Sequence, residues 1–239
     1  MNVQLFIPCF IDQLYPSVAF NMVKVLEKAG CTVSYNTGQT CCGQPAYNAG
    51  FWGEAKEVCS KFLSDFSGSD YIVAPSASCV GFVRNYYIKL FENAPESALA
   101  KKTAERIFEF SEFLVHILKV DDLGASFPAK VTYHDSCAGL RECRIKNEPR
   151  QLLSKVKGLE LVEMNDVETC CGFGGTFAVK FEPISIAMGD QKVTNAAATG
   201  AAYIVSTDMS CLMHIDGCNK HKNAGLQVMH LADVLASGW

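Results

Sequence analysis

The stretch "YIVAPSASC" (Tyr71–Cys79) returns near the end of the chain as "YIVSTDMSC" (Tyr203–Cys211), with Tyr-Ile-Val and Ser-Cys retained at a spacing of 132 residues. A second pair, "VQLFIPC" (Val3–Cys9) and "VTYHDSC" (Val131–Cys137), repeats at a spacing of 128 residues. Two Cys-Cys-Gly triplets lie 129 residues apart. Because these landmarks keep nearly one spacing, the chain contains two copies of one unit.

Both copies alternate short apolar strands with helical segments. In the first copy the pattern predicts strands at residues 3–7, 31–35 and 71–74, and helices after Pro16 and at 55–66. In the second copy it predicts strands at 131–134, 159–163 and 203–206, and helices at 149–156 and 184–198. Short strands separated by helices are typical of parallel sheets covered on both faces. We therefore expect an α/β fold with two lobes related by pseudo-twofold symmetry and a short parallel sheet in each.

The turn-rich segment "VDDLGASFPAK" (Val120–Lys130) lies between the two copies. It predicts a first module at residues 1–125 and a second at 126–239, joined in one compact unit. The preceding stretch, Ala98–Leu118, carries apolar residues at helical spacing. For this stretch we expect a helix that covers a sheet or joins the lobes.

The composition is that of a globular protein. The 239 residues carry a net charge of −4, which gives no support for nucleic-acid binding, and 49% of them are hydrophobic. No apolar stretch reaches the roughly 18 residues that a membrane span requires. The first ten residues lack a basic leader and a cleavage site, so we expect a cytoplasmic protein with reduced thiols. Its twelve cysteines then indicate metal binding, redox chemistry or simple burial.

Eight of the twelve cysteines recur in both copies, each soon after a predicted strand. Three loops of each copy supply them, in the patterns C-x31-CCG-x35-C and C-x32-CCG-x38-C. Because the carboxyl ends of parallel strands meet at one edge of a sheet, we expect four sulfurs to come together in each lobe. Thiolates in sets of four are typical ligands of iron–sulfur clusters and of tetrahedral zinc. The candidate metal ligands are Cys9, Cys41, Cys42, Cys79, Cys137, Cys170, Cys171 and Cys211.

A glycine follows each cysteine pair. Gly43 and Gly172 allow the backbone to pass close to a bulky centre or to adopt a positive φ, and Gly174 extends this freedom in the second loop. Because their N–H groups are free to contact cluster sulfurs, these three are predicted cofactor-binding residues. The four cysteines without a counterpart are expected to be buried or incidental thiols: Cys31, Cys59, Cys143 and Cys218.

The paired modules resemble the cysteine-rich (CCG) domain proteins, which include the B subunit of heterodisulfide reductase and the C subunit of anaerobic glycerol-3-phosphate dehydrogenase. The resemblance covers essentially the whole chain, and "PSASC", "YHDSC" and "STDMSCLMHI" make it most similar to the lactate-utilization group of that family. It implies an iron–sulfur electron-transfer subunit of a complex that oxidises L-lactate to pyruvate, with a cluster site in each lobe. The implied partners are a ferredoxin-like iron–sulfur subunit and a third small subunit.

The chain departs from the heterodisulfide reductase pattern, which ends in Cys-x-x-Cys. Phe82 and His214 stand where the last cysteine of each module would be. Four cysteines per module still suit a conventional cluster, and His214 is a further candidate ligand because imidazole can replace thiolate at iron. The pair His134-Asp135, just before Cys137, either orients a ligand or consists of a packed histidine and a capping aspartate.

Two other classes of function remain open. A structural zinc protein would use the same thiolates, in one or both sites, to tie loops together. A thiol–disulfide enzyme would cycle Cys41–Cys42 or Cys170–Cys171 through bridges to distant thiols, because adjacent cysteines rarely pair comfortably. No flavin or nicotinamide site that could take a hydride is visible, so we expect a subunit without activity of its own and name no catalytic residue. A basic segment from Arg141 to Lys157 either docks an acidic partner or is simply solvated.

Overall fold

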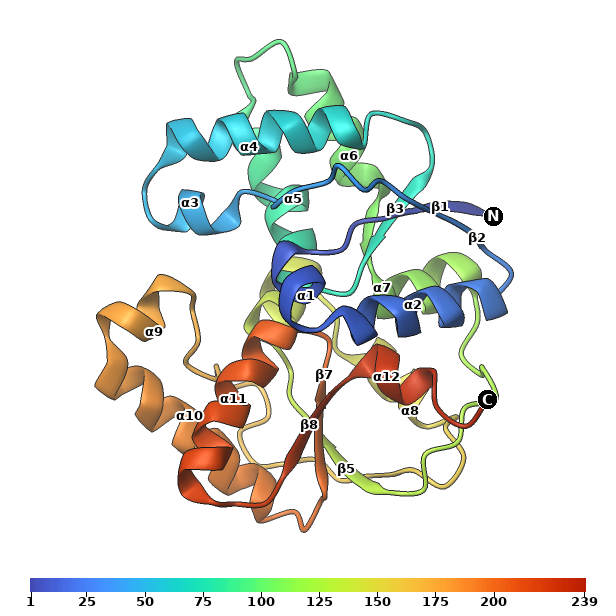
Figure 1. Cartoon of the computed structure of the whole chain (residues 1–239), viewed down its shortest axis with the longest axis vertical. Helices are drawn as coiled ribbons and strands as arrows, with labels where there is room; N and C mark the ends of the chain where they lie inside the picture. Colours follow the sequence, from blue (N-terminus) through green and yellow to red (C-terminus); the bar gives the residue numbers. More distant parts are fainter.

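Two four-stranded sheets with equivalent strand orders form the framework of the chain (Figure 1). The computed structural model describes residues 1–239. The first sheet has the order β2-β1-β3-β4 and consists of β1 (Asn2–Leu5), β2 (Thr32–Tyr35), β3 (Tyr71–Ala74) and β4 (Ile107–Glu109). The second has the order β6-β5-β7-β8 and consists of β5 (Lys130–Tyr133), β6 (Glu160–Leu161), β7 (Tyr203–Ser206) and β8 (Gln227–His230). All strand pairs are parallel, so the predicted α/β fold with two similar lobes is confirmed.

Helices connect the strands, because parallel neighbours need crossover connections. The first lobe contains α1 (Cys9–Leu14), α2 (Pro16–Lys28), α3 (Gln44–Asn48), α4 (Trp52–Asp65), α5 (Ala77–Leu90), α6 (Ser97–Arg106), α7 (Phe110–Glu112) and the π-helix η1 (Phe113–Leu118). The second contains the π-helix η2 (Gly139–Cys143), α8 (Asn147–Leu153), α9 (Thr176–Lys180), α10 (Glu182–Ala197), α11 (Met209–Lys222) and α12 (Leu231–Leu235). No helix combines the length and the apolar character that a membrane crossing requires.

The continuous helix expected at Ala98–Leu118 is wrong. Helix α6 ends at Arg106, the next three residues form β4 along the open edge of β3, and helical structure resumes at α7. Glu109 ends the strand and caps α7, because its Oε2 accepts the N–H of Ser111 at 2.8 Å. Pairing with β3 satisfies the backbone groups of residues 107–109, and this pairing cannot be inferred from the spacing of apolar residues. The sequence pattern does not predict the fourth strand of either sheet, β4 or β8.

Helices α2 and α12 lie between the two sheets and pack against each other (Figure 1). Asn21 of α2 donates a hydrogen bond to Asp233 Oδ1 of α12 at 2.8 Å. Val3 of β1 and Val131 of β5 belong to the same buried hydrophobic cluster. The two lobes therefore share a core.

Candidate metal centres

The recurring cysteines of the first module lie beyond the carboxyl ends of three strands. Cys9 begins α1 after β1, Cys41 and Cys42 lie between β2 and α3, and Cys79 lies in the first turn of α5 after β3. Ser76 caps α5, because its Oγ accepts the N–H of Cys79 at 3.5 Å. Each thiol is thus carried by a loop or helix start that the sheet positions.

These four sulfurs come together and are called the first thiol group. Cys9 interacts with Cys41, and Cys41 interacts with Cys42. Cys42 Sγ lies 3.5 Å from Cys79 Sγ. Cys9 is exposed and Cys42 is buried, so the group runs from the surface into the lobe.

The second module repeats the arrangement and forms the second thiol group. Cys137 interacts with Cys170, Cys170 with Cys171, and Cys171 with Cys211. The eight candidate cysteines therefore form two rows of neighbouring thiols, one in each lobe. The cysteines outside these groups are buried: Cys31, Cys59, Cys143 and Cys218.

One thiol in each group is stabilised as a thiolate. Hydrogen bonds from the adjoining thiols of the same group lower the pKa of Cys41 to about 3 and that of Cys170 to about 2. The same hydrogen bonds raise the pKa values of the thiols that donate them. Because the thiolate is the form that binds a metal, each group presents one thiolate suited to a soft metal ion.

Gly43 and Gly172 shape the two cysteine loops in the same way. Each donates its N–H to the first sulfur of its pair at 3.4 Å, and their φ angles are +90° and +94°. A Cβ at Gly43 would lie 2.7 Å from Cys59 Sγ, and a Cβ at Gly172 would lie 2.5 Å from the backbone oxygen of Ser185. Only glycine fits both the backbone conformation and the space.

The two remaining predicted site residues have other contacts. Gly174 (φ +52°) turns the chain towards α9, and a Cβ there would meet Phe177 at 2.8 Å. His214 Nε2 lies 3.3 Å from Ser185 Oγ and 3.2 Å from Ser185 O. Ser185 Oγ in turn donates to the carbonyl of Gly172 at 2.7 Å. The structure thus places His214 as a support of the second cysteine loop.

The nitrogen that lies among the sulfurs belongs to His134. A ring nitrogen of His134, Cys171 Sγ and Cys211 Sγ lie within 4.8 Å of one another. The His134 side chain is fully buried, and neither nitrogen has a hydrogen-bond partner, which costs about 1–3 kcal/mol for a buried polar group. Burial lowers the pKa of His134 to about 3, so the ring is neutral. Asp135 does not pair with it, because both carboxylate oxygens accept from Arg150 at 2.9 Å.

The donor chemistry of both thiol groups fits an iron–sulfur cluster. Four sulfurs per group and N–H groups directed at sulfur are features of such sites. Four thiolates also fit closed, tetrahedral zinc. The donor set alone selects soft metal centres and excludes calcium and magnesium, which prefer oxygen ligands.

Comparison with known proteins shows which family contains these cysteine-rich modules. The family described as "Cysteine-rich domain" (CCG) matches residues 3–84 and again residues 131–216. The chain belongs to the cysteine-rich CCG domain family. Similar proteins include Lactate utilization protein A of Geobacillus kaustophilus (strain HTA426), 44% identical over 98% of both chains. Lactate utilization protein A of Bacillus subtilis (strain 168) is 42% identical over 99% of this chain and 100% of its own length.

A solved structure shows the same fold. The crystal structure of a hypothetical protein from Helicobacter pylori superposes with a TM-score of 0.60 at 13% sequence identity. The match covers 98% of this chain and 48% of that chain, so this chain corresponds to about half of it. At this identity the likeness concerns the fold alone.

The two CCG modules meet at a seam between the helices that carry their last cysteines. Ser76 and Asp208, which are equivalent in the repeat, form an isolated antiparallel bridge. Asp208 Oδ2 accepts the N–H of Ser78 at 2.9 Å, and Oδ1 accepts the hydroxyl of Ser210 at 2.9 Å. Burial raises the pKa of Asp208. Through this carboxylate, the helix starts of both modules are tied to each other.

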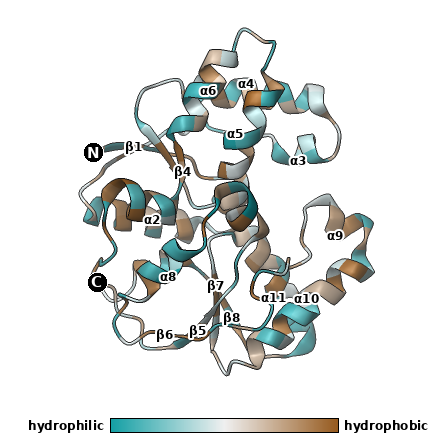
Figure 2. Cartoon of the chain, turned by 180° about the vertical axis from the view of Figure 1, so that it is seen from behind, coloured by the Kyte–Doolittle hydropathy of each residue, from teal (hydrophilic) through white to brown (hydrophobic).

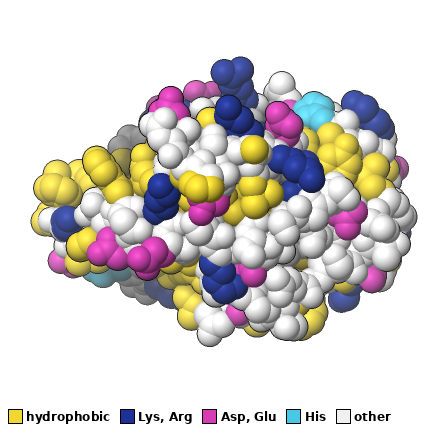
Figure 3. Space-filling view, turned by 90° about the horizontal axis from the view of Figure 1, so that it is seen from above, with side chains coloured by type: hydrophobic (Ala, Val, Ile, Leu, Met, Phe, Trp, Pro, Cys, Tyr) yellow, Lys and Arg dark blue, Asp and Glu magenta, His cyan; other side chains and the backbone are white.

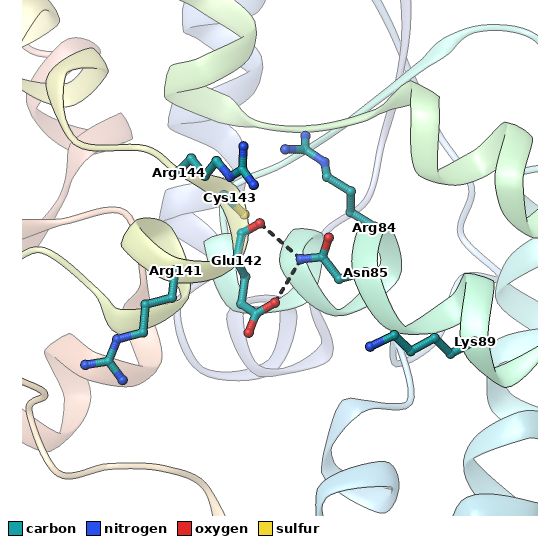
Figure 4. Close-up of a pocket in the computed structure, with 7 residues that line it drawn as sticks. All are labelled: Arg84, Asn85, Lys89, Arg141, Glu142, Cys143 and Arg144. Carbon is teal, nitrogen blue, oxygen red and sulfur yellow. Dashed lines mark hydrogen bonds between the residues drawn. The ribbon is translucent and has the colours of Figure 1, made fainter.

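A cationic cavity of about 560 Å³ lies at another contact between the modules, between α5 and η2 (Figure 4). It is lined by Arg84, Asn85 and Lys89 from α5 and by Arg141, Glu142, Cys143 and Arg144 from η2 and the residue after it. Asn85 Nδ2 holds the two walls together, because it donates to Glu142 Oε2 at 2.8 Å and to Glu142 O at 3.0 Å. A second cavity of about 240 Å³ is lined by Gln44, Arg141 and Cys137, among others, so it reaches the second thiol group. Its lining carries one cation, Arg141, and one anion, Glu142, so the excess of positive charge belongs to the first cavity alone.

Proposed function

We propose that this chain is the iron–sulfur electron-transfer subunit of a multi-subunit complex that oxidises L-lactate to pyruvate. The observation that carries the proposal is the gathering of eight cysteines into two groups of four at the carboxyl edges of two equivalent sheets. An iron–sulfur cluster bound there would accept and pass on single electrons. The assigned ligands are Cys9, Cys41, Cys42 and Cys79 in the first module and Cys137, Cys170, Cys171 and Cys211 in the second.

The chain's own residues hold the thiolates in place and moderate their charge. The N–H groups of Gly43 and Gly172 each donate to a sulfur, and such hydrogen bonds raise the reduction potential of a thiolate-bound centre. In the first module, the carbonyl of Cys42 accepts hydrogen bonds from the Tyr87 hydroxyl at 2.6 Å and from the Cys59 thiol at 3.4 Å. These contacts fix the loop before any metal arrives.

Relatives support the lactate part of the proposal. Proteins named Lactate utilization protein A match this chain over nearly its whole length at 42–44% identity. The proposal therefore includes the partners that the family resemblance implies, a ferredoxin-like iron–sulfur subunit and a third small subunit. All twelve cysteines are free thiols, which suits a reducing cytoplasm.

Exposed apolar side chains beside the cysteine loops support contact with a partner subunit. Phe51 and Trp52 are exposed at the start of α4, and Val179, Phe181 and Ile184 are exposed in and after α9. Helices α3 and α9 project on the same side of the molecule (Figures 1 and 2). Hydrophobic side chains also gather at the end of the molecule on that side in the view from above (Figure 3). Apolar surface next to both thiol groups favours a docked protein there.

Two other functions would use the same sulfurs differently. Closed zinc sites would make both thiol groups structural, and they would carry no electrons. A thiol–disulfide enzyme is favoured by one contact, the 3.5 Å separation of Cys42 Sγ and Cys79 Sγ. Such an enzyme would need no metal at either site.

Growth on lactate tests the proposed function. In a bacterium that lacks its own lactate utilization protein A but retains the partner subunits, the wild-type chain should restore growth on L-lactate. The double variants Cys41→Ser/Cys42→Ser and Cys170→Ser/Cys171→Ser should not, whereas Cys31→Ser, outside both thiol groups, should still grow. Growth of either double variant at the wild-type rate would contradict the proposal.

A further inference from the structure

The strongest unexplained feature of the molecule is a buried histidine with nothing to bind. His134 follows β5 directly, is 0% exposed and leaves both ring nitrogens without a hydrogen-bond partner. Buried polar groups are nearly always paired, so an orphaned imidazole indicates a partner that the protein chain does not supply. The nearest suitable atoms are two sulfurs of the second thiol group, Cys171 Sγ and Cys211 Sγ, within 4.8 Å.

The backbone of His134 is anchored to the neighbouring strand. The N–H of His134 donates to Val205 O at 2.8 Å, and its carbonyl accepts from Ser206 Oγ at 2.9 Å. Both contacts tie the residue to the end of β7, the strand that precedes Cys211. The backbone from which the imidazole projects is therefore held at the edge of the sheet.

Neighbouring polar groups do not explain the histidine. Asp135 is engaged by Arg150 through two hydrogen bonds. Lys192, also buried, donates to the carbonyls of Asp166 at 2.6 Å and Val167 at 3.2 Å. With these groups paired elsewhere, the sulfurs of Cys171 and Cys211 are the candidate partners that lie beside the ring.

The equivalent position in the first module carries no donor. Phe6 aligns with His134 in the repeat, and it packs edge-on against Phe62 at a centroid distance of 4.8 Å and against Phe66 at 5.8 Å. Side chains alternate across a strand, so Phe6 and His134 occupy the same face of their sheets. The histidine is thus a feature of the second module alone.

We infer that His134 is a fifth protein ligand of the second metal centre, binding metal through a ring nitrogen beside Cys171 and Cys211. The inference rests on the proposed function and adds to it that the two centres differ: the first is bound by thiolates alone, the second by thiolates and a neutral imidazole. Replacing or supplementing thiolate with imidazole raises the reduction potential of an iron–sulfur centre. The second centre is therefore the better electron acceptor of the pair.

The test isolates the second centre in the full-length chain. A Cys41→Ser/Cys42→Ser background removes metal from the first module, and the chain is loaded anaerobically with iron and sulfide and reduced by one electron. Pulsed electron paramagnetic resonance then compares protein containing ¹⁴N-histidine with protein containing ¹⁵N-histidine. We expect a nitrogen coupling that changes with the isotope, disappears in His134→Phe and persists in the matched control His214→Gln.

A rescue variant separates ligand loss from misfolding. His134→Cys restores a soft donor, so it should retain iron against a chelator as the background protein does, while lacking the nitrogen coupling. His134→Phe should lose iron about tenfold faster or more, the scale on which metal sites respond to loss of a supporting group.

The outcomes distinguish the two proposals. A loaded iron–sulfide centre without any histidine coupling, or a coupling that is lost only in His214→Gln, would overturn the assignment of His134 and leave the proposed function intact. Absence of iron and sulfide from the background protein and from the wild type alike would instead remove the proposed function.

Discussion

The two CCG modules share a framework and differ in what surrounds their sulfurs. Strand order, loop positions and the four cysteines are the same in both. The first thiol group adjoins an aromatic cluster that includes Phe6, whereas the second adjoins His134, with Ser185 and His214 supporting its cysteine loop. The repeat thus keeps its cysteine positions while the neighbouring side chains differ. The modules offer one scaffold with two different environments.

The largest expected effect is the loss of metal from one module at a time. Cys41→Ser/Cys42→Ser should lower iron and sulfide per chain to about half by emptying the first module, and Cys170→Ser/Cys171→Ser should do the same by emptying the second. The physical reason is that each pair supplies two of only four thiolates in its group, and a soft metal is not retained by the remainder. Metal and sulfide analysis of the anaerobically purified variants measures this.

A matched control is Cys218→Ser, which removes a buried thiol outside both groups. If either double variant lost all metal, the modules would not bind independently, and the comparison between them would fail.

Glycine-to-alanine substitutions compare how much space the cysteine loops of the two modules leave for a side chain. Gly50→Ala tests backbone strain alone, because φ is +90° and no atom lies within 4 Å of the added Cβ; it should destabilise by about 1–2 kcal/mol. Gly172→Ala should cost about 3 kcal/mol or more, because its Cβ would also lie 2.5 Å from a backbone oxygen. Gly43→Ala should fall between them, since its closest contact is the Cys59 thiol.

Chemical denaturation of the three variants measures their free energies of unfolding and so gives the order of the losses. An equal loss of stability in Gly50→Ala and Gly172→Ala would show that space at the second cysteine loop is not limiting.

Substitutions of exposed apolar side chains should lower the affinity for a partner subunit and leave the metal content unchanged. Phe181→Glu, near the second thiol group, should weaken binding of a partner subunit about tenfold, or about 1.4 kcal/mol, by placing a charge on exposed apolar surface. Trp52→Glu tests the corresponding surface of the first module. Calorimetric titration with the purified partner measures affinity, and iron content is the control.

A larger loss for one variant would show which module docks the partner. Unchanged affinity in both would refute the assignment of this surface.

A difference in pH dependence concerns the residues that end β4 and β8. Burial raises the pKa of Glu109 to about 8, so folding favours the protonated acid, and its contribution to stability is lost as pH rises from about 4.5 through 8. Burial lowers the pKa of His230, so folding favours the neutral ring, and stability is lost as pH falls below about 6.5. The equivalent positions therefore carry opposite pH dependences.

Melting temperatures at pH 5 and pH 8 check this. Relative to the wild type, Glu109→Gln should gain stability at the higher pH, with a slope of up to about 1.4 kcal/mol per pH unit, and His230→Asn should gain it at the lower pH. Parallel pH profiles for both variants would contradict the opposite signs.

Repetition made most of the fold predictable from sequence. Strands at Tyr71–Ala74 and Tyr203–Ser206 were apparent because the same motif occurs twice, and the ends of these strands located the cysteines. The segment at 107–109 was missed because its apolar residues also fit a helix, and only the open edge of β3 selects a strand there. Pairing with β3 determines that these residues form a strand, which the local spacing of apolar residues does not show.

The donor set was partly predictable for a similar reason. The eight cysteines share a spacing, so their convergence followed from the parallel sheets. His214 attracted attention because it stands at the position of a family cysteine, yet its nitrogen lies against Ser185. For His134 the sequence predicts either a residue that orients a ligand or a packed histidine, and not a metal ligand. Its alignment with Phe6 is a usable signal, but its lack of hydrogen-bond partners is evident only once its burial is known.

Metal and sulfide content of the wild-type chain tests the central claim most directly. The chain is purified without oxygen, and iron, zinc and acid-labile sulfide are measured per polypeptide together with the visible absorption spectrum. Two filled iron–sulfur sites predict iron and sulfide in near-equal amounts, a brown colour, and the loss of half of each in either paired-cysteine variant. Zinc without sulfide, or free thiols without metal, would contradict electron transfer by this chain.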